Sequence, residues 1–214
     1  MNKKLNFRNI LQRFSGLFSL AISDIISTGI SVLFWLYLAT LLEVESYGEV
    51  SYLLAIAGMV TSISLLGSKY TISVYVPKNI QLESAIFLIA IIISSVSSLL
   101  LFLIYDNAGL SLYVFGAVIF GLGTAEIIAK KLYMSYPKYL LTQKVLMVVL
   151  SIGLYHLIGI DGIILGIALS YFVYIKIIIQ TFKVTPIDFS LLRPRFGFLI
   201  NSYMMDILST LGKQ

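Results

Sequence analysis

RFSGLFSLAISDIISTGISVLFW, from Arg13 to Trp35, decides the fold of this chain, because it is an apolar run long enough to cross a lipid bilayer. It carries a single carboxylate, Asp24. On an ideal α-helix Asp24, Thr28, Ser31 and Trp35 fall within an arc of roughly 60°, so the helix has one polar face. An ionised carboxylate in hydrocarbon costs at least ~2.5 kcal/mol, and we therefore expect Asp24 to face a hydrated cavity or a partner.

The composition places the whole chain in the same class. Of its 214 residues, 59% are hydrophobic and only 12% are charged, and the mean hydropathy is +0.98. One small soluble core cannot hide that much apolar surface, so we predict an all-α polytopic membrane protein. The net charge is +5, but the basic residues are dispersed among the apolar runs, which favours anionic lipid head groups over nucleic acid. The chain has no cysteine, which excludes disulfides and thiolate metal sites.

The apolar runs predict six membrane spans and the start of a seventh, each near the ~20 residues that a helix needs to cross. Strands are disfavoured, because the runs are continuous and do not alternate. The predicted spans are 17–42, 48–68, 82–105, 109–129, 140–159 and 161–182, and the seventh begins near 197. The corresponding domains are an amphipathic lead-in at 1–16, a six-helix lobe at 17–182, a linker at 183–196 and the start of a second lobe at 197–214.

The charged residues alternate between the two sides of this arrangement and predict its orientation. Every lysine and arginine up to Arg195 falls before span one, between spans two and three, between four and five, or from the end of six onward. The opposite turns carry the acids Glu43, Glu45, Glu49, Asp106 and Asp161, together with His156. By the positive-inside rule the amino terminus is cytoplasmic, and we expect a multi-pass protein of the cell (inner, cytoplasmic) membrane.

The connections between the spans are short. Asp106–Gly109 and Gly159–Gly162 have the composition of tight turns on the outer side. Pro77 and Pro137 are expected in the inner loops, where helices stop. Turns of this length leave no room for an extracellular domain.

The seventh span resembles the first. When Arg195-Phe196 is placed on Arg13-Phe14, the segment DILST at 206–210 falls on DIIST at 24–28, so Asp206 is the counterpart of Asp24. Six helices separate the two starts, which predicts a parallel repeat about an axis along the membrane normal. Chance similarity between two apolar segments is the alternative. The repeat predicts that this chain is the amino-terminal half of a larger transporter, or that a second lobe or copy completes it.

The stretch YLATLLEVESYGEVSYLLAIAGMVTSISLLGSKYTISVYVPK, at 37–78, resembles the first turn and second helix of the polysaccharide transporter (flippase) family, within the multidrug/oligosaccharidyl-lipid/polysaccharide exporter superfamily. Glu43 stands where that family usually has glycine. The stretch LTQKVLMVVLSIGLYHLIGIDGIILGIALSYFV, at 141–173, is similar to its fifth and sixth spans around a G-x-x-G turn. The resemblance implies two six-helix lobes that carry polyprenyl-linked sugars of polysaccharide or lipopolysaccharide biosynthesis across the membrane by alternating access. Polysaccharide polymerases or glycosyltransferases are the implied partners.

Such a substrate has an anionic phosphate, a polar sugar and a long apolar tail, so its carrier needs a hydrated and partly cationic cavity. Lys69, Arg13 and Lys130 are candidate phosphate partners, and the alternative is that each only snorkels to the interface. Glu126, four residues before Lys130, favours a helical ion pair over a role in the cavity. Trp35 could stack on a sugar, but its position near the outer turn favours an interfacial belt.

Small residues recur at helical spacing in spans one and six. A serine stands at every fourth position from Ser15 to Ser31, and Gly162 and Gly166 are four apart. Both patterns predict close helix contacts in preference to ligand sites. His156 is the only histidine, so we expect no metal site there.

Three roles stay open for Asp24: coupling transport to a proton or sodium gradient, pairing with a basic group, or shaping a hydrated lining. No other cofactor is expected. An enzyme acting on lipid phosphates would need several acids, a metal site or long interfacial loops, so we predict no enzymatic activity. A multidrug or cation antiporter of the same superfamily, and a non-transporting half-protein, are the alternatives to a flippase.

Overall fold

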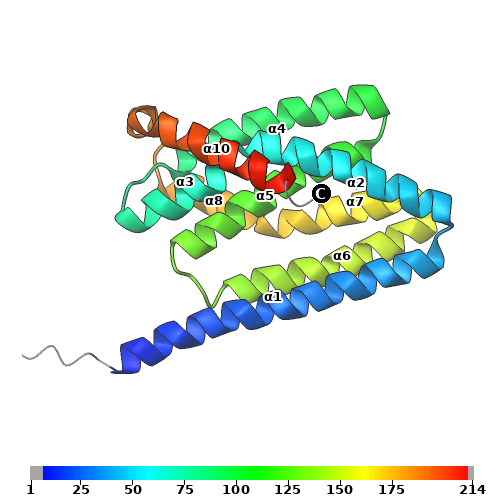
Figure 1. Ribbon diagram of the computed structural model, residues 1–214, viewed down its shortest axis with the longest axis horizontal. Helices are drawn as coiled ribbons and strands as arrows, with labels where there is room; N and C mark the ends of the chain where they lie inside the picture. Colours follow the sequence, from blue (N-terminus) through cyan, green and yellow to red (C-terminus); the bar gives the residue numbers. More distant parts are fainter. Residues whose placement is uncertain (1–6, 212–214) are drawn as a thin grey trace, which may run out of the picture.

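The computed structural model describes the backbone of residues 7–211 and the side chains of residues 16, 18–195 and 197–204. Within these bounds the chain is almost entirely helical and contains no strand, and Figure 1 shows the helices packed lengthwise into one bundle. The long helices are α1 (Phe7–Leu41), α2 (Val44–Leu65), α4 (Glu83–Tyr105), α5 (Ala108–Ala129) and α6 (Tyr136–Ile158). The shorter ones are α3 (Ser68–Tyr75), η1 (Val76–Lys78), α7 (Ile160–Tyr171), η2 (Phe172–Tyr174), α8 (Ile175–Val184), α9 (Phe189–Leu192), η3 (Arg193–Arg195) and α10 (Phe196–Leu211).

Among the described residues, six segments are long and apolar enough to cross a membrane. They are Phe18–Leu41, Val44–Leu65, Glu83–Tyr105, Ala108–Ala129, Tyr136–Ile158 and Ile160–Val184. Each lies within a few residues of a span predicted from the sequence, so the all-α polytopic bundle is confirmed and the chain is a multi-pass membrane protein. We call the end that carries connections 66–82, 130–135 and 185–195 the basic end, and the opposite end, with turns at 42–43, 106–107 and 159, the acidic end.

The helix α5 forms the centre of the bundle. It packs against α2, α3, α4, α7 and α8. Of the residues in its most apolar stretch, 67% are buried inside the bundle, whereas the corresponding share is 17% in α1 and in α6. Figure 1 shows α1 and α6 side by side along one edge, with α7 between α6 and the rest of the bundle. The bundle therefore leaves most of α1 uncovered.

The helices α6 and α7 approach very closely, as the spacing of two glycines predicts. A Cβ atom on Gly166 would lie 2.4 Å from the Cα atom of Ser151, and one on Gly162 would lie 2.3 Å from the carbonyl oxygen of Leu154. A buried hydrogen bond of 2.9 Å, from the side-chain amide of Gln143 to the Ser170 hydroxyl, joins the same two helices. The predicted close contact is confirmed, and no larger side chain fits at either glycine.

The second and sixth spans are less regular than expected. The second ends at Leu66 and Gly67, which both have left-handed backbone angles, φ 45° and φ 69°, and the short α3 follows at a new angle. The sixth is interrupted at η2, so α7 and α8 are joined through a tight turn of 3-10 helix. Neither break follows from hydrophobic periodicity, because the apolar pattern continues through both.

Pro137 does not lie in an inner loop, as the sequence predicted, but in the first turn of α6. Proline is tolerated there because the first backbone N–H groups of a helix have no partner inside the helix. The fifth span therefore begins at Tyr136, and Lys138 lies inside it instead of before it.

The helix α10 stands where the seventh span was predicted, and it packs against α3 and α2. Leu199 joins the hydrophobic core together with Leu65 and Ile72, and a Cβ atom on Gly67 would lie 2.6 Å from the Tyr203 nitrogen. The side chain of Asp206, the predicted repeat counterpart, lies outside the described residues. The connection at 185–195 thus leads directly back onto the six-helix unit.

Candidate functional site

Asp24 is held from a distant part of the chain. Its Oδ1 atom accepts a hydrogen bond of 2.7 Å from the Tyr136 hydroxyl. Tyr136 is the first residue of α6 and is buried, whereas Asp24 is exposed on the surface of the bundle. Because α6 begins at Tyr136, this tyrosine lies beside Asp24 of α1. The helices α1 and α6 together therefore position the carboxylate.

The predicted polar face of α1 divides into three parts. Asp24 and Thr28 are exposed, and the Ser31 hydroxyl donates back to the Ser27 carbonyl oxygen at 2.9 Å. Trp35 packs edge-on against Tyr47, with ring centroids 6.1 Å apart, next to the turn between α1 and α2. Asp24 and Thr28 therefore remain as the open polar surface, and Trp35 lies at the acidic end.

The serine pattern of α1 makes a helix contact. Ser23 and Ser27 are buried, and both hydroxyls donate to carbonyl oxygens of the preceding turn, at 2.8 Å and 3.0 Å. Beside them a shallow hollow of about 300 Å³ lies between α1 and α6. Its lining is Phe18, Ser19, Ile22, Ser23, Ile26, Pro137 and Leu141.

A second cluster lies at the basic end, where two carboxylates meet one ammonium group. Lys130 forms an ion pair with Glu126 on the same helix and a longer one, 3.9 Å, with Glu83 at the start of α4. The Thr181 hydroxyl of α8 donates to Glu126 Oε1 at 3.0 Å, and the Ser84 hydroxyl donates to the Thr185 carbonyl oxygen at 2.8 Å. Three helices thus converge on Lys130, and the predicted ion pair between Glu126 and Lys130 is confirmed.

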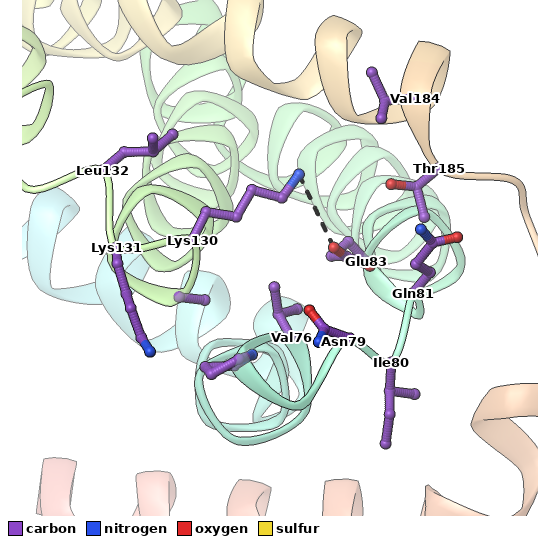
Figure 2. A pocket seen from close by; sticks show the side chains of 12 residues that line it. Val76, Asn79, Ile80, Gln81, Glu83, Lys130, Lys131, Leu132, Val184 and Thr185 are labelled. Carbon is purple, nitrogen blue, oxygen red and sulfur yellow. Dashed lines mark ion pairs between the residues drawn. The ribbon is translucent and has the colours of Figure 1, made fainter. Parts of the chain in front are cut away.

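Two cavities open beside this cluster. One of about 530 Å³ is lined by Glu83, Lys130 and Lys131 together with Asn79 and Gln81 among others, and Figure 2 shows the Lys130 side chain reaching across it toward Glu83. A neighbouring cavity of about 440 Å³ is lined by Glu126 and Lys130 from the other side. Lys130 therefore stands between two spaces large enough for water.

The remaining candidates are dispersed. Lys69 is exposed on α3 at the basic end, and its Cε atom would lie 2.7 Å from a Cβ atom on Gly121 of α5. The side chain of Arg13 lies outside the described residues. His156 is exposed and lies beside the Tyr155 ring at 5.5 Å, and no metal-binding group of histidines, cysteines and acids occurs in the part of the chain that the structure describes.

Sequence reasoning missed Tyr136, Glu83 and Lys144 as members of these sites. Tyr136 carries no local signal, because its partner, Asp24, is 112 residues away. Glu83 carries a visible signal, because it is an acid in the first turn of a strongly apolar helix on the basic side. Lys144 is half-buried inside α6. The predicted fifth span, 140–159, already contains it, although it was counted with the lysines of the inner connection.

No protein-family model, no curated protein and no solved structure gives a significant match to the chain.

Proposed function

We propose that this chain is a transporter lobe that flips a polyprenyl-linked oligosaccharide or polysaccharide precursor across the cytoplasmic membrane by alternating access. The observation that carries the proposal is the exposed Asp24 carboxylate, inside a membrane-spanning segment and held by Tyr136. The resemblance of segments 37–78 and 141–173 to polysaccharide transporters adds the substrate class.

An exposed carboxylate at membrane depth is costly unless water or a polar partner solvates it. One hydrogen bond from a tyrosine does not replace the hydration shell of an ionised carboxylate, and lipid supplies no further donor. The surface around Asp24 and Thr28 must therefore face water or another polar group. A hydrated strip along a membrane-spanning helix is what a sugar head group needs in order to cross.

The substrate phosphate needs a cation along the same path. Lys130 is engaged by Glu126 and Glu83, so it is a weaker candidate than the sequence indicated. Lys144 lies inside α6, the helix that also supplies Tyr136, and the structure shows no ion pair for it among the described residues. We assign the phosphate contact to Lys144 within the membrane and to Lys69 at the basic end.

In the proposed orientation, the amino terminus and the basic end lie in the cytoplasm, as the distribution of lysines and arginines predicts. A second lobe or a second copy covers the open side of α1 and completes the cavity. Asp24 is the candidate site for a coupling proton or sodium ion.

Reconstitution tests this function. The purified chain is placed in vesicles containing a fluorescent polyprenyl-phosphate sugar, and the fraction of label that an impermeant quencher reaches is followed over time, with and without a proton or sodium gradient. We expect flipping above that of protein-free vesicles, a loss of at least tenfold in Asp24→Asn, and an unchanged rate in Glu45→Gln, an exposed acid at the acidic end.

Three results contradict the proposal. Unchanged transport in Asp24→Asn removes the role of the carboxylate. Export of cationic dyes without movement of the lipid-linked sugar assigns the lobe to multidrug transport, and absence of both activities in a folded sample assigns it to a non-transporting half-protein.

A further inference from the structure

The cluster around Lys130 contains two buried carboxyl groups and only one cation. Glu83 and Glu126 each contribute a carboxyl group, with side chains only 4% and 2% exposed, and Lys130 contributes one ammonium group that is 34% exposed. If both acids were ionised, one buried negative charge would have no counterion. Burial without pairing costs several kcal/mol for such a charge, so a proton or another cation must neutralise it.

The two carboxyl groups are not equivalent. Glu126 is the closer partner of Lys130 and also accepts a hydrogen bond from Thr181. Glu83 makes the longer contact with Lys130, 3.9 Å, and a hydrogen bond with its own backbone. In both residues the Oε2 atom is buried with no hydrogen-bond partner among the described residues. A close opposite charge favours the ionised form of a carboxyl group, and Glu83 is the acid that lies farther from Lys130, so we assign the proton to Glu83.

The other charged groups near this end do not neutralise Glu83. Within the described part of the chain, the ion pairs that either carboxylate makes are those with Lys130. Lys131 lines the larger cavity and Lys183 the smaller one. Lys78 and Arg195 lie over the Tyr75 ring, at 5.6 Å and 5.3 Å from its centroid, and Asp188 caps α9 by accepting from the Ser190 nitrogen.

We propose that Glu83 and Glu126 together bind one exchangeable proton at neutral pH, carried by Glu83. The cluster then holds one ammonium, one carboxylate and one neutral carboxyl group, and its net charge is zero. The cavity of about 530 Å³ beside Glu83 admits the water that delivers and removes the proton. This proton site does not rest on the proposed transport of a lipid-linked sugar.

The site links protonation to the position of Lys130. Lys130 also lines the second cavity, so an anion bound there would draw the ammonium group away from the acids. Two buried carboxylates without a cation cannot both stay ionised, and a second proton would follow. Removal of the Lys130 charge is the simplest way to imitate that state.

Infrared spectroscopy of the full chain in lipid vesicles tests the proposal. Labelling all glutamates with carbon-13 at the side-chain carboxyl separates their bands from those of Asp24 and the other aspartates. We expect a carbonyl band of one protonated glutamate at neutral pH, its loss in Glu83→Gln, and its retention in Glu49→Gln, an exposed acid at the acidic end. We expect the band to double in Lys130→Gln.

A wild-type chain without a protonated glutamate at neutral pH overturns the proposal, and so does a band that survives in Glu83→Gln. Circular dichroism and gel filtration establish that each variant is folded. Should Glu83→Gln not fold, the wild-type band and its change in Lys130→Gln decide: an unchanged band in Lys130→Gln contradicts the shared site.

Discussion

At the scale of single residues, two acids in the apolar spans, Asp24 and Glu126, each contact a residue far away in sequence. Asp24 depends on Tyr136, and Glu126 depends on Lys130 and Thr181. The pair Glu126 and Lys130 was predictable because a spacing of four residues places two side chains on one face of a helix. Tyr136 and Thr181 were not, because no local spacing encodes which distant helix lies alongside.

The hydrogen bond between Asp24 and Tyr136 predicts coupled effects on transport. Tyr136→Phe removes only the hydroxyl, so we expect the flipping rate to fall about fivefold, equivalent to ~1 kcal/mol for one hydrogen bond at an exposed carboxylate. If the two groups act together, the double variant with Asp24→Asn falls no further than Asp24→Asn alone. Fully additive losses in the vesicle assay would show that the groups act independently.

The ion pair of Glu126 predicts an asymmetric effect on stability. Glu126→Gln leaves Lys130 with Glu83 as a charged partner and relieves the excess of negative charge, so we expect a loss of less than ~1.5 kcal/mol. Lys130→Met leaves two buried acids without a cation and should cost about 3 kcal/mol at neutral pH. The cost should be smaller at acidic pH, where the same carboxyl groups are protonated in the unfolded chain as well. Unfolding in mixed micelles at two pH values measures this difference. A larger loss in Glu126→Gln than in Lys130→Met would contradict it.

At the scale of helices, the sequence predicted the positions of the six spans well, but it did not predict where helices end or break. The six spans follow from continuous apolar runs, which only a membrane interior accommodates. The turn at Leu66 and Gly67, the start of α6 at Tyr136 and the break at η2 were not foreseen. Each depends on packing against another helix, as in the contact of Gly67 with the backbone of α10.

The contact between α6 and α7 predicts a position-specific effect of glycine substitution. Gly166→Leu would force side-chain atoms against the Ser151 backbone, so we expect destabilisation of at least ~1–3 kcal/mol, the usual range for overpacking. Gly153→Leu on α6 is the matched control, because a Cβ atom there meets nothing within 4 Å. Thermal unfolding of the two variants in detergent measures the difference, and equal stabilities would contradict the close approach.

At the scale of the whole molecule, the bundle has a basic end and an acidic end, and the positive-inside rule predicts that the basic end lies in the cytoplasm. The native chain has no cysteine, so single cysteines can be introduced without a background. In intact cells, we expect an impermeant thiol reagent to label Val44→Cys at the acidic end and to leave Lys78→Cys at the basic end unlabelled. The reverse pattern would invert the orientation.

The open side of α1 is the feature of the whole molecule on which the proposed function depends. Its central claim is that Thr28, beside Asp24, faces water, whereas Leu33, about 140° around the same helix, faces lipid. Both side chains are exposed in the structure, and Leu33 is 68% exposed, so burial in the bundle does not separate them.

Solvent accessibility of Thr28→Cys and Leu33→Cys in membranes tests this claim most directly, because it needs no substrate and no knowledge of the coupling ion. We predict rapid reaction of Thr28→Cys with a charged, water-soluble thiol reagent and no reaction of Leu33→Cys, although a lipid-soluble reagent modifies both. If Thr28→Cys is as unreactive toward the charged reagent as Leu33→Cys, the polar face of α1 is not hydrated and the account is contradicted.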